Sequence, residues 1–230
     1  MKTNEITNPK YLNFPVSFLR KRDLIEILEM AFLFCSYETM TRENGDRNYF
    51  ERLIEKKGLY SDETDYFSDA KQLYVDNKKS LRCGVNLSVF ANYISTSKDK
   101  LNLEFRAYCA TKAILGRKVY GKTTLKHIFA LMFGYNCIDD MSEKTKLDLS
   151  GTASVRSMKR ILSKLEEKWH LSVYSIHSHG MYISYKLLPV NLIVEVKKDK
   201  ILLKNKQKLN EKKADAILSD FLIGINVDSD

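Results

Sequence analysis

The sequence predicts an α+β fold that is predominantly helical, and three observations support this. Apolar residues make up 44% of the 230-residue chain and charged residues 29%, which is enough apolar material for a packed core. With 9 Gly and 3 Pro, the chain has too few turn residues for a β-sandwich. Apolar residues recur at three- and four-residue steps in most segments and alternate in only a few. The length fits one large domain or two small ones.

The first hundred residues predict a helical module. Residues 14–19 form a short segment containing Pro15, which favours an extended entry. The apolar spacing that follows Asp23 predicts a helix, with this acidic residue in the first turn, where the helix dipole favours it. Further elements are expected in this half: helices over residues 47–57 and 65–74 and an extended piece over residues 85–90.

The second half predicts a helix, a short strand, a second helix, a polar loop, a third helix and a two-stranded hairpin. Glycines end the first two helices, and the sequence Gly151-Thr-Ala-Ser154 opens the third. The expected ranges are 103–115 (helix), 117–120 (strand), 123 or 124 to 133 (helix), 151–168 (helix), and 171–176 and 181–187 (hairpin strands).

The last forty residues predict a strand-and-helix appendage. Leu192, Val194 and Val196 alternate with polar residues, which favours one or two strands around residues 197–200. An amphipathic helix is expected over residues 211–223. We therefore predict three units: a helical module at 1–100, a second module at 101–190 and the appendage at 191–230. Dimerisation through the last helix and packing of that helix on its own domain both explain its amphipathic pattern, so a homodimer stays open.

Positive charge is concentrated in one stretch of the chain. Lys and Arg number 38 against 29 Asp and Glu, a net charge of +9. Residues 101–190 contain 14 basic and 7 acidic residues, which accounts for most of the surplus. A local surplus of this kind raises affinity for a polyanion, so nucleic acid is the first partner to consider. A basic surface with no specific partner is the alternative.

The element order over residues 103–187 resembles the winged helix-turn-helix fold of bacterial transcription regulators and plasmid-type replication initiators. The resemblance covers about 85 residues and rests on element order. It implies that the third helix enters the DNA major groove and that the hairpin, or wing, contacts the neighbouring backbone or minor groove. Residues 154–168 would then be the recognition helix and residues 177–180 the wing tip. The N-terminal module could itself be a degenerate winged helix.

The predicted recognition helix has chemistry suited to reading DNA. Arg156, Arg160 and Lys164 form a row at four-residue steps. The apolar residues expected to face the core are Val155, Met158, Leu162 and Leu165. We expect Arg156, Ser157 and Arg160 to approach bases. Phosphate contacts are expected from Lys159 and Lys164, from Lys122 and Lys126 at the start of the preceding helix, and from His177 and His179 at the wing tip. An ordinary solvated amphipathic helix is the competing interpretation.

A rival motif lies in the same module. The run Gly116-Arg-Lys-Val-Tyr-Gly121-Lys122-Thr123 matches the phosphate-binding pattern G-x-x-x-x-G-K-[ST]. In a P-loop enzyme a buried strand precedes the first glycine, whereas residues 103–115 have helical spacing and contain charged residues. A nucleotide-hydrolysing function therefore stands as an alternative rather than as the main hypothesis.

Other candidate sites are weaker. The cysteines Cys35, Cys83, Cys109 and Cys137 form no C-x-x-C pair, so we predict free thiols and no zinc knuckle. His177 and His179 would need a third ligand from elsewhere to hold a metal. No segment resembles a signal peptide or a membrane span, so we expect a cytoplasmic protein with no membrane partner.

The function predicted from sequence is the binding of duplex DNA, to regulate transcription or to initiate replication of a mobile element. No catalytic constellation is visible, so we expect neither enzymatic activity nor a cofactor. A P-loop NTPase and a winged-helix protein-protein adaptor without DNA binding are the alternatives.

Overall fold

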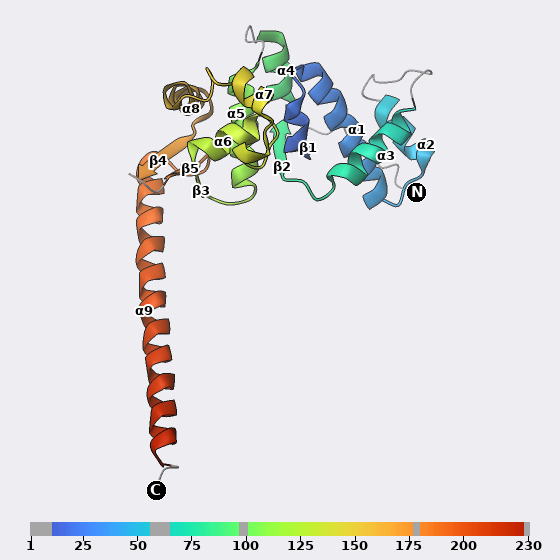
Figure 1. The fold of residues 1–230 in the computed structure, drawn as a ribbon. Helices are drawn as coiled ribbons and strands as arrows, with labels where there is room; N and C mark the ends of the chain where they lie inside the picture. The colour runs from blue at the N-terminus through green and yellow to red at the C-terminus, as the bar shows by residue number, and fades with distance from the viewer. Residues whose placement is uncertain (1–10, 56–64, 97–100, 177–179, 228–230) are drawn as a thin grey trace.

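The computed structural model describes residues 11–55, 65–96, 101–176 and 180–227, with side chains described as far as Asp215 apart from residue 176. These residues form a mostly helical body with two small antiparallel sheets, and a long helix extends from it (Figure 1). The predominantly helical α+β class is therefore confirmed. The helices are α1 (Leu24–Arg42), α2 (Arg47–Glu55), α3 (Tyr66–Asn77), α4 (Leu87–Thr96), α5 (Leu103–Leu115), α6 (Leu125–Met132), α7 (Glu143–Asp148), α8 (Val155–Trp169) and α9 (Pro189–Val227). The strands are β1 (Tyr11–Pro15), β2 (Arg82–Asn86), β3 (Gly121–Thr123), β4 (Ser172–Ile176) and β5 (Gly180–Ser184), and the 3-10 helices are η1 (Val16–Arg20) and η2 (Ile138–Asp140).

The two extended entry segments of the N-terminal half pair with each other. β1 and β2 run antiparallel, with Leu12 opposite Val85, and the side chains of both residues are buried. The expected entry at residues 14–19 is extended only as far as Pro15, after which η1 begins. Likewise, the piece expected at residues 85–90 becomes helical from Leu87 onward. The sheet therefore ends where each of its two strands is followed by a helix.

The helices of this half begin at side-chain caps. The Asp23 carboxylate accepts a hydrogen bond from the Ile25 amide at 2.9 Å and caps α1, so it lies just before the first turn in which the sequence placed it. Asp65 caps α3 in the same way. α1 packs along α3, and a small second core lies between α1, α2 and α3. Its buried members are Leu33, Met40, Phe50, Ile54 and Ala70.

The second half contains the expected helices and hairpin around a three-stranded sheet in the order β3-β5-β4. α5 has the predicted bounds and ends at Gly116. The first strand is displaced from the prediction: it forms at Gly121–Thr123, opposite β5, because residues 117–120 are used in the turn out of α5. The polar loop before α8 contains η2 and the short helix α7, which the sequence did not predict.

One main core joins the two halves. It contains buried side chains from Leu12 in β1 to Ile183 in β5, so the described core does not divide near residue 100. Phe90 of α4 and Phe105 of α5, on either side of residue 100 in the sequence, pack together with their ring centroids 4.6 Å apart. The N-terminal helices and the second module therefore pack as neighbours on shared apolar side chains.

The tail differs from its prediction. Residues 189–227 form one continuous helix, so the strands expected around residues 197–200 are wrong. Leu192 and Val196 are 0% and 1% exposed, whereas Val194 is 43% exposed. A spacing of four residues on one helix face thus produced the apparent alternation. Pro189 occupies the first helical position, where its missing amide hydrogen costs nothing.

Candidate nucleic-acid interface

α8 is fixed to the body by a cap and an apolar face. The Ser154 hydroxyl accepts a hydrogen bond from the Ser157 amide at 3.1 Å and starts the helix. The buried side chains are Met158, Ile161, Leu162 and Leu165. Val155, which we expected in the core, is 59% exposed because the first turn extends past the edge of the packed surface. Ile161 occupies the core in its place.

The basic residues of α8 lie on the outer side of the helix. Arg156, Lys159, Arg160 and Lys164 are all exposed in the chain as described. At about 100° per residue, Arg156 and Arg160 point most directly away from the buried face, and Lys164 lies toward one edge. Ser157, expected to approach bases, lies farther round that edge and is half-buried. Ser163 is instead exposed beside the arginines.

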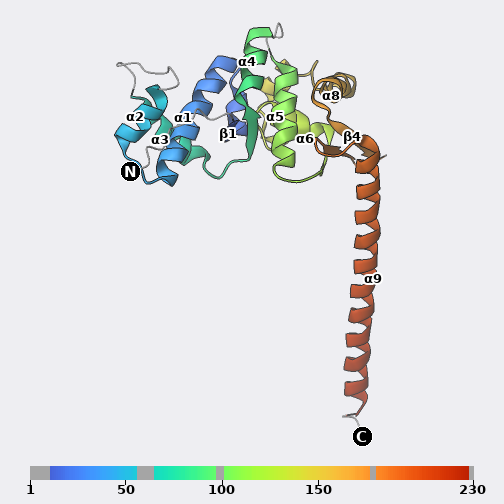
Figure 2. The ribbon, with the colours of Figure 1, turned by 180° about the vertical axis from the view of Figure 1, so that it is seen from behind.

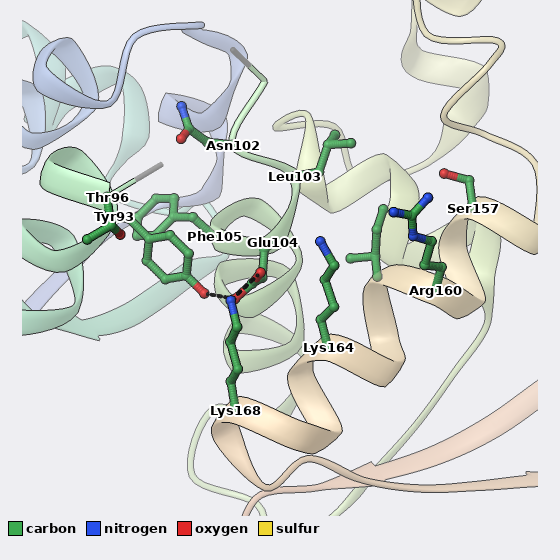
Figure 3. A pocket seen from close by; sticks show the side chains of 11 residues that line it. Tyr93, Thr96, Asn102, Leu103, Glu104, Phe105, Ser157, Arg160, Lys164 and Lys168 are labelled. Carbon is green, nitrogen blue, oxygen red and sulfur yellow. Dashed lines mark hydrogen bonds and ion pairs between the residues drawn. The ribbon is translucent and has the colours of Figure 1, made fainter. Parts of the chain in front are cut away.

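A polar network ties the C-terminal end of α8 to α4 and α5 (Figure 3). The Lys168 ammonium lies 2.9 and 3.0 Å from the two carboxylate oxygens of Glu104. Tyr93 donates a hydrogen bond to Glu104 at 2.6 Å and accepts one from the indole nitrogen of Trp169 at 2.9 Å. Burial, followed by the hydrogen bond to Glu104, raises the pKa of Tyr93, so this hydroxyl stays protonated and keeps donating. The Lys168 side chain is 58% exposed, but this ion pair ties it to α5, unlike the four outer basic residues.

Two further tyrosines pack beside this network. The ring of Tyr108 lies 5.0 Å from that of Trp169 and 5.7 Å from that of Tyr185. Burial raises the pKa of Tyr108 to about 12 and raises that of Tyr185 as well. Both rings are therefore neutral at ordinary pH, and they act as rigid support for α5 and the hairpin. Through its contacts with Tyr93 and Tyr108, Trp169 joins the end of α8 to α4 and α5.

A pocket of about 460 Å³ lies along one edge of α8. Figure 3 shows Arg160 and Lys164 on the α8 side of this pocket, with Leu103 and Glu104 of α5 facing them. Ser157 contributes a hydroxyl to the same wall. This wall is cationic, so it can accept a negatively charged group such as a backbone phosphate. Sequence reasoning missed the pocket because α4 and α5 supply its other side.

Lys122 and Lys126 are both exposed, but they lie on different elements. Lys126 is in the first turn of α6, which Thr124 caps by accepting a hydrogen bond from the His127 amide at 3.1 Å. Lys122 lies on β3, opposite Tyr182 of β5, so its predicted position at the start of the helix is wrong. The chain pairs with the hairpin before it turns into α6, and this moves Lys122 onto the sheet.

The hairpin tip lies partly outside the described residues. His177 and His179 belong to the segment that the structure does not describe, so their predicted phosphate contacts stay predictions. β4 and β5 flank this segment, and β5 begins at Gly180, which has φ +85°. A Cβ atom at Gly180 would lie 2.5 Å from the Thr123 carbonyl oxygen. Only glycine therefore lets the hairpin approach β3 this closely.

The P-loop motif has the wrong setting for binding a phosphate. Helix α5 precedes Gly116 and strand β3 contains Lys122, the reverse of the strand-loop-helix order that a P-loop requires. The amide of Gly116 donates to the Lys112 carbonyl, and the amide of Lys118 donates to that of Leu115, each at 2.8 Å. These amides close the end of α5 and are not available to cradle a phosphate. The nucleotide alternative has no support in this geometry.

The described residues also bear on the cysteines, on metal binding and on membrane spans. All four cysteines are free thiols, with Cys83 and Cys109 buried and Cys137 exposed. Across residues 11–55, 65–96, 101–176 and 180–227, no three His, Cys, Asp or Glu side chains gather closely enough to hold a metal ion. Nor does any helix among these residues combine the length and the apolar character needed to cross a membrane. Comparison with protein-family models, with curated proteins and with solved structures found no match for this chain.

Proposed function

We propose that this chain binds duplex DNA through a winged helix-turn-helix module, with α8 as the recognition helix. The order α5, β3, α6, α8, β4, β5 and the sheet order β3-β5-β4 support this interpretation. They correspond to a first helix, a short strand, two further helices and a wing hairpin that pairs with the first strand. η2 and α7 are then an insertion between the second and third helices.

The observation that carries the proposal is the exposed basic row on α8. Arg156, Lys159, Arg160 and Lys164 form no ion pair with any described residue, and none of them is buried by the rest of the chain. Arginine can bind the edge of guanine with two parallel hydrogen bonds, so Arg156 and Arg160 are assigned to bases. Lys159 and Lys164, at the two edges of the row, are assigned to phosphates, as are Lys122 and Lys126.

Rigid attachment of α8 also supports the proposal. Base readout needs side chains that are held in position, and α8 is held by a buried apolar face, by the Ser154 cap and by the Lys168–Glu104 pair. The pocket beside Lys164 leaves room for a phosphate group along the edge of the helix. This function assigns no chemical step to the protein, and it is compatible with either transcription regulation or replication initiation.

The test is a double variant, Arg156→Ala with Arg160→Ala. We expect its specific binding to be weaker by on the order of 2–5 kcal/mol, because each arginine that reads a base contributes about 1–3 kcal/mol. A site selected from random duplexes supplies the probe, and an anisotropy titration at fixed salt gives the affinity. Both side chains are exposed, so the urea unfolding midpoint of the variant should match that of the wild type.

The matched control removes two positive charges from elsewhere on the body. Arg42→Ala with Lys71→Ala changes exposed residues of α1 and α3 and should leave specific binding unchanged. Equal losses in the two variants would reduce the role of α8 to general charge attraction. Negligible affinity of the wild type for any duplex at low salt would reject DNA binding and favour the adaptor alternative.

A further inference from the structure

α9 leaves the body after its second turn and is exposed from there on. Leu192 and Val196 are buried where α9 packs on β4 and β5, whereas every residue from Lys197 to Asp215 is exposed. This exposed stretch contains eight lysines against three acidic residues. At about 1.5 Å per residue, the helix extends about 45 Å beyond Val196. Beyond Val196, a long basic helix thus projects into solvent. Contacts with the described part of the body do not account for its excess of lysines.

The lysines divide between two sides of α9. At about 100° per residue, Lys208 and Lys212 lie opposite the face that Leu192 and Val196 turn to the sheet. Lys198, which pairs with Glu195 at 2.9 Å, and Lys197 lie within about 60° of the same direction, and we call these four residues the outward ridge. Lys206 and Lys213 lie on the side that faces the body. Lysines four residues apart on the ridge are about 6 Å apart along the axis.

The position of α9 relative to α8 indicates what the outward ridge can contact. In both Figure 1 and Figure 2, α8, the β4–β5 hairpin and α9 follow one another down the same edge of the molecule. A duplex that contacted α8 and the hairpin and ran down this edge would pass beside α9. The outward ridge faces away from the β4–β5 hairpin on which α9 packs, so its lysines are open to a polyanion along this edge.

We propose that the outward ridge of α9 binds the phosphate backbone of the DNA that flanks the site read by α8. This inference rests on the proposed function and adds to it a contact that does not depend on sequence. Eight lysines oppose pairing with a second copy of the helix, because like charges along both helices repel. The exposed apolar residues Ile201, Leu202 and Leu203 point to different sides, so the stretch of α9 whose side chains are described, Lys197 to Asp215, presents no single apolar face to a membrane.

The experiment compares two pairs of substitutions on one helix. The outward variant is Lys208→Gln with Lys212→Gln, and the matched control is Lys206→Gln with Lys213→Gln. Both remove two charges from α9, and glutamine keeps the helix propensity of lysine. The probe is a duplex that carries the selected site and about 15 base pairs on either side, which exceeds the reach of α9. Affinity is measured in the full-length protein as a function of salt.

We expect the outward variant to reduce the slope of log K against log salt by about 2, because each phosphate contact contributes about 0.9. The loss of affinity between 50 and 200 mM salt should then be roughly tenfold smaller than in the wild type. The control variant should keep the wild-type slope. On a duplex trimmed to the site alone, the outward variant and the wild type should have the same slope.

Each other outcome overturns the inference. Equal slopes for the outward variant and the wild type on the long duplex, or equal changes in the outward and control variants, would remove the ridge as a DNA contact. If the outward variant keeps the wild-type salt slope on DNA but no longer binds vesicles of anionic lipid, the ridge is assigned to a membrane surface instead. If Arg156→Ala with Arg160→Ala abolishes specific binding while the outward variant has no effect, the proposed function stands and this inference alone fails.

Discussion

Arg106 is a charged side chain inside the main core, and it is 1% exposed. Its guanidinium donates to the carbonyls of Leu101 and Lys21, each at 2.6 Å, and to that of Leu19. These carbonyls lie at the end of η1, in the turn after it and just before α5. One side chain thereby satisfies several buried acceptors and joins the N-terminal segment to the second module.

Replacement of Arg106 by Ala should therefore be costly. The carbonyls would lose their donors inside the core, and we expect the free energy of unfolding to fall by about 3 kcal/mol or more. Urea denaturation measures the loss. Arg22→Ala is the control, because the Arg22 side chain is exposed and its ion pair with Asp148 spans 3.7 Å. That change should cost less than about 1 kcal/mol, and similar losses in both variants would contradict this role of Arg106.

At this scale the sequence predicts exposed side chains better than buried polar ones. Arg156 and Arg160 are exposed as their helical position indicates. Arg106, by contrast, lies in an apolar helical pattern with no sign that it is buried, because two of its acceptors, the carbonyls of Leu19 and Lys21, lie more than eighty residues away in the sequence. Ser157 was misplaced for a related reason: the rotation of α8 on α5 decides which edge of the helix faces the pocket.

Among the elements, helix ends were the most predictable features. Asp23, Thr124 and Ser154 each cap a helix, and Gly116 ends one. These signals are local, since a cap needs only a side chain and an amide two or three residues away. The short strand β3 was less predictable because its position depends on pairing with β5, about sixty residues later.

The cap of α8 can be tested directly. Ser154→Ala removes the acceptor for the Ser157 amide, so we expect a loss of about 1 kcal/mol in the free energy of unfolding. Ser163→Ala makes the same substitution in the exposed middle of the helix and should be neutral or slightly stabilising, since Ala has the higher helix propensity. Urea unfolding of the two variants checks this. A smaller loss for Ser154→Ala than for Ser163→Ala would be inconsistent with the cap.

For the whole molecule, the projection of α9 makes a prediction about stability. Residues 197–215 are exposed, so most of this helix adds nothing to the packing of the body. Removal of residues 201–230 keeps Leu192, Val196 and the hydrogen bond from Tyr120 to Asp199. We expect the free energy of unfolding to change by less than about 0.5 kcal/mol, while helical circular dichroism falls.

Leu192→Ala in the full-length chain is the comparison for this truncation. Leu192 is fully buried, and the cavity left by this change should cost about 2–5 kcal/mol. The urea midpoints of the two proteins should therefore separate clearly. A truncated chain that is as unstable as Leu192→Ala would mean that the distal part of α9 packs against something, such as a second copy of the chain.

By itself, the sequence determined the helical class, the approximate bounds of α5, α6 and α8, the hairpin and the basic row on α8. Each of these depends on residues close together in the chain: apolar spacing, caps, turn residues and charge. The tertiary structure decided the rest: the pairing of β1 with β2, the core shared across residue 100, the pocket beside α8 and the continuous α9. These depend on which distant surfaces meet, and an alternating pattern such as Leu192, Val194 and Val196 fits a strand or a helix until one face is buried.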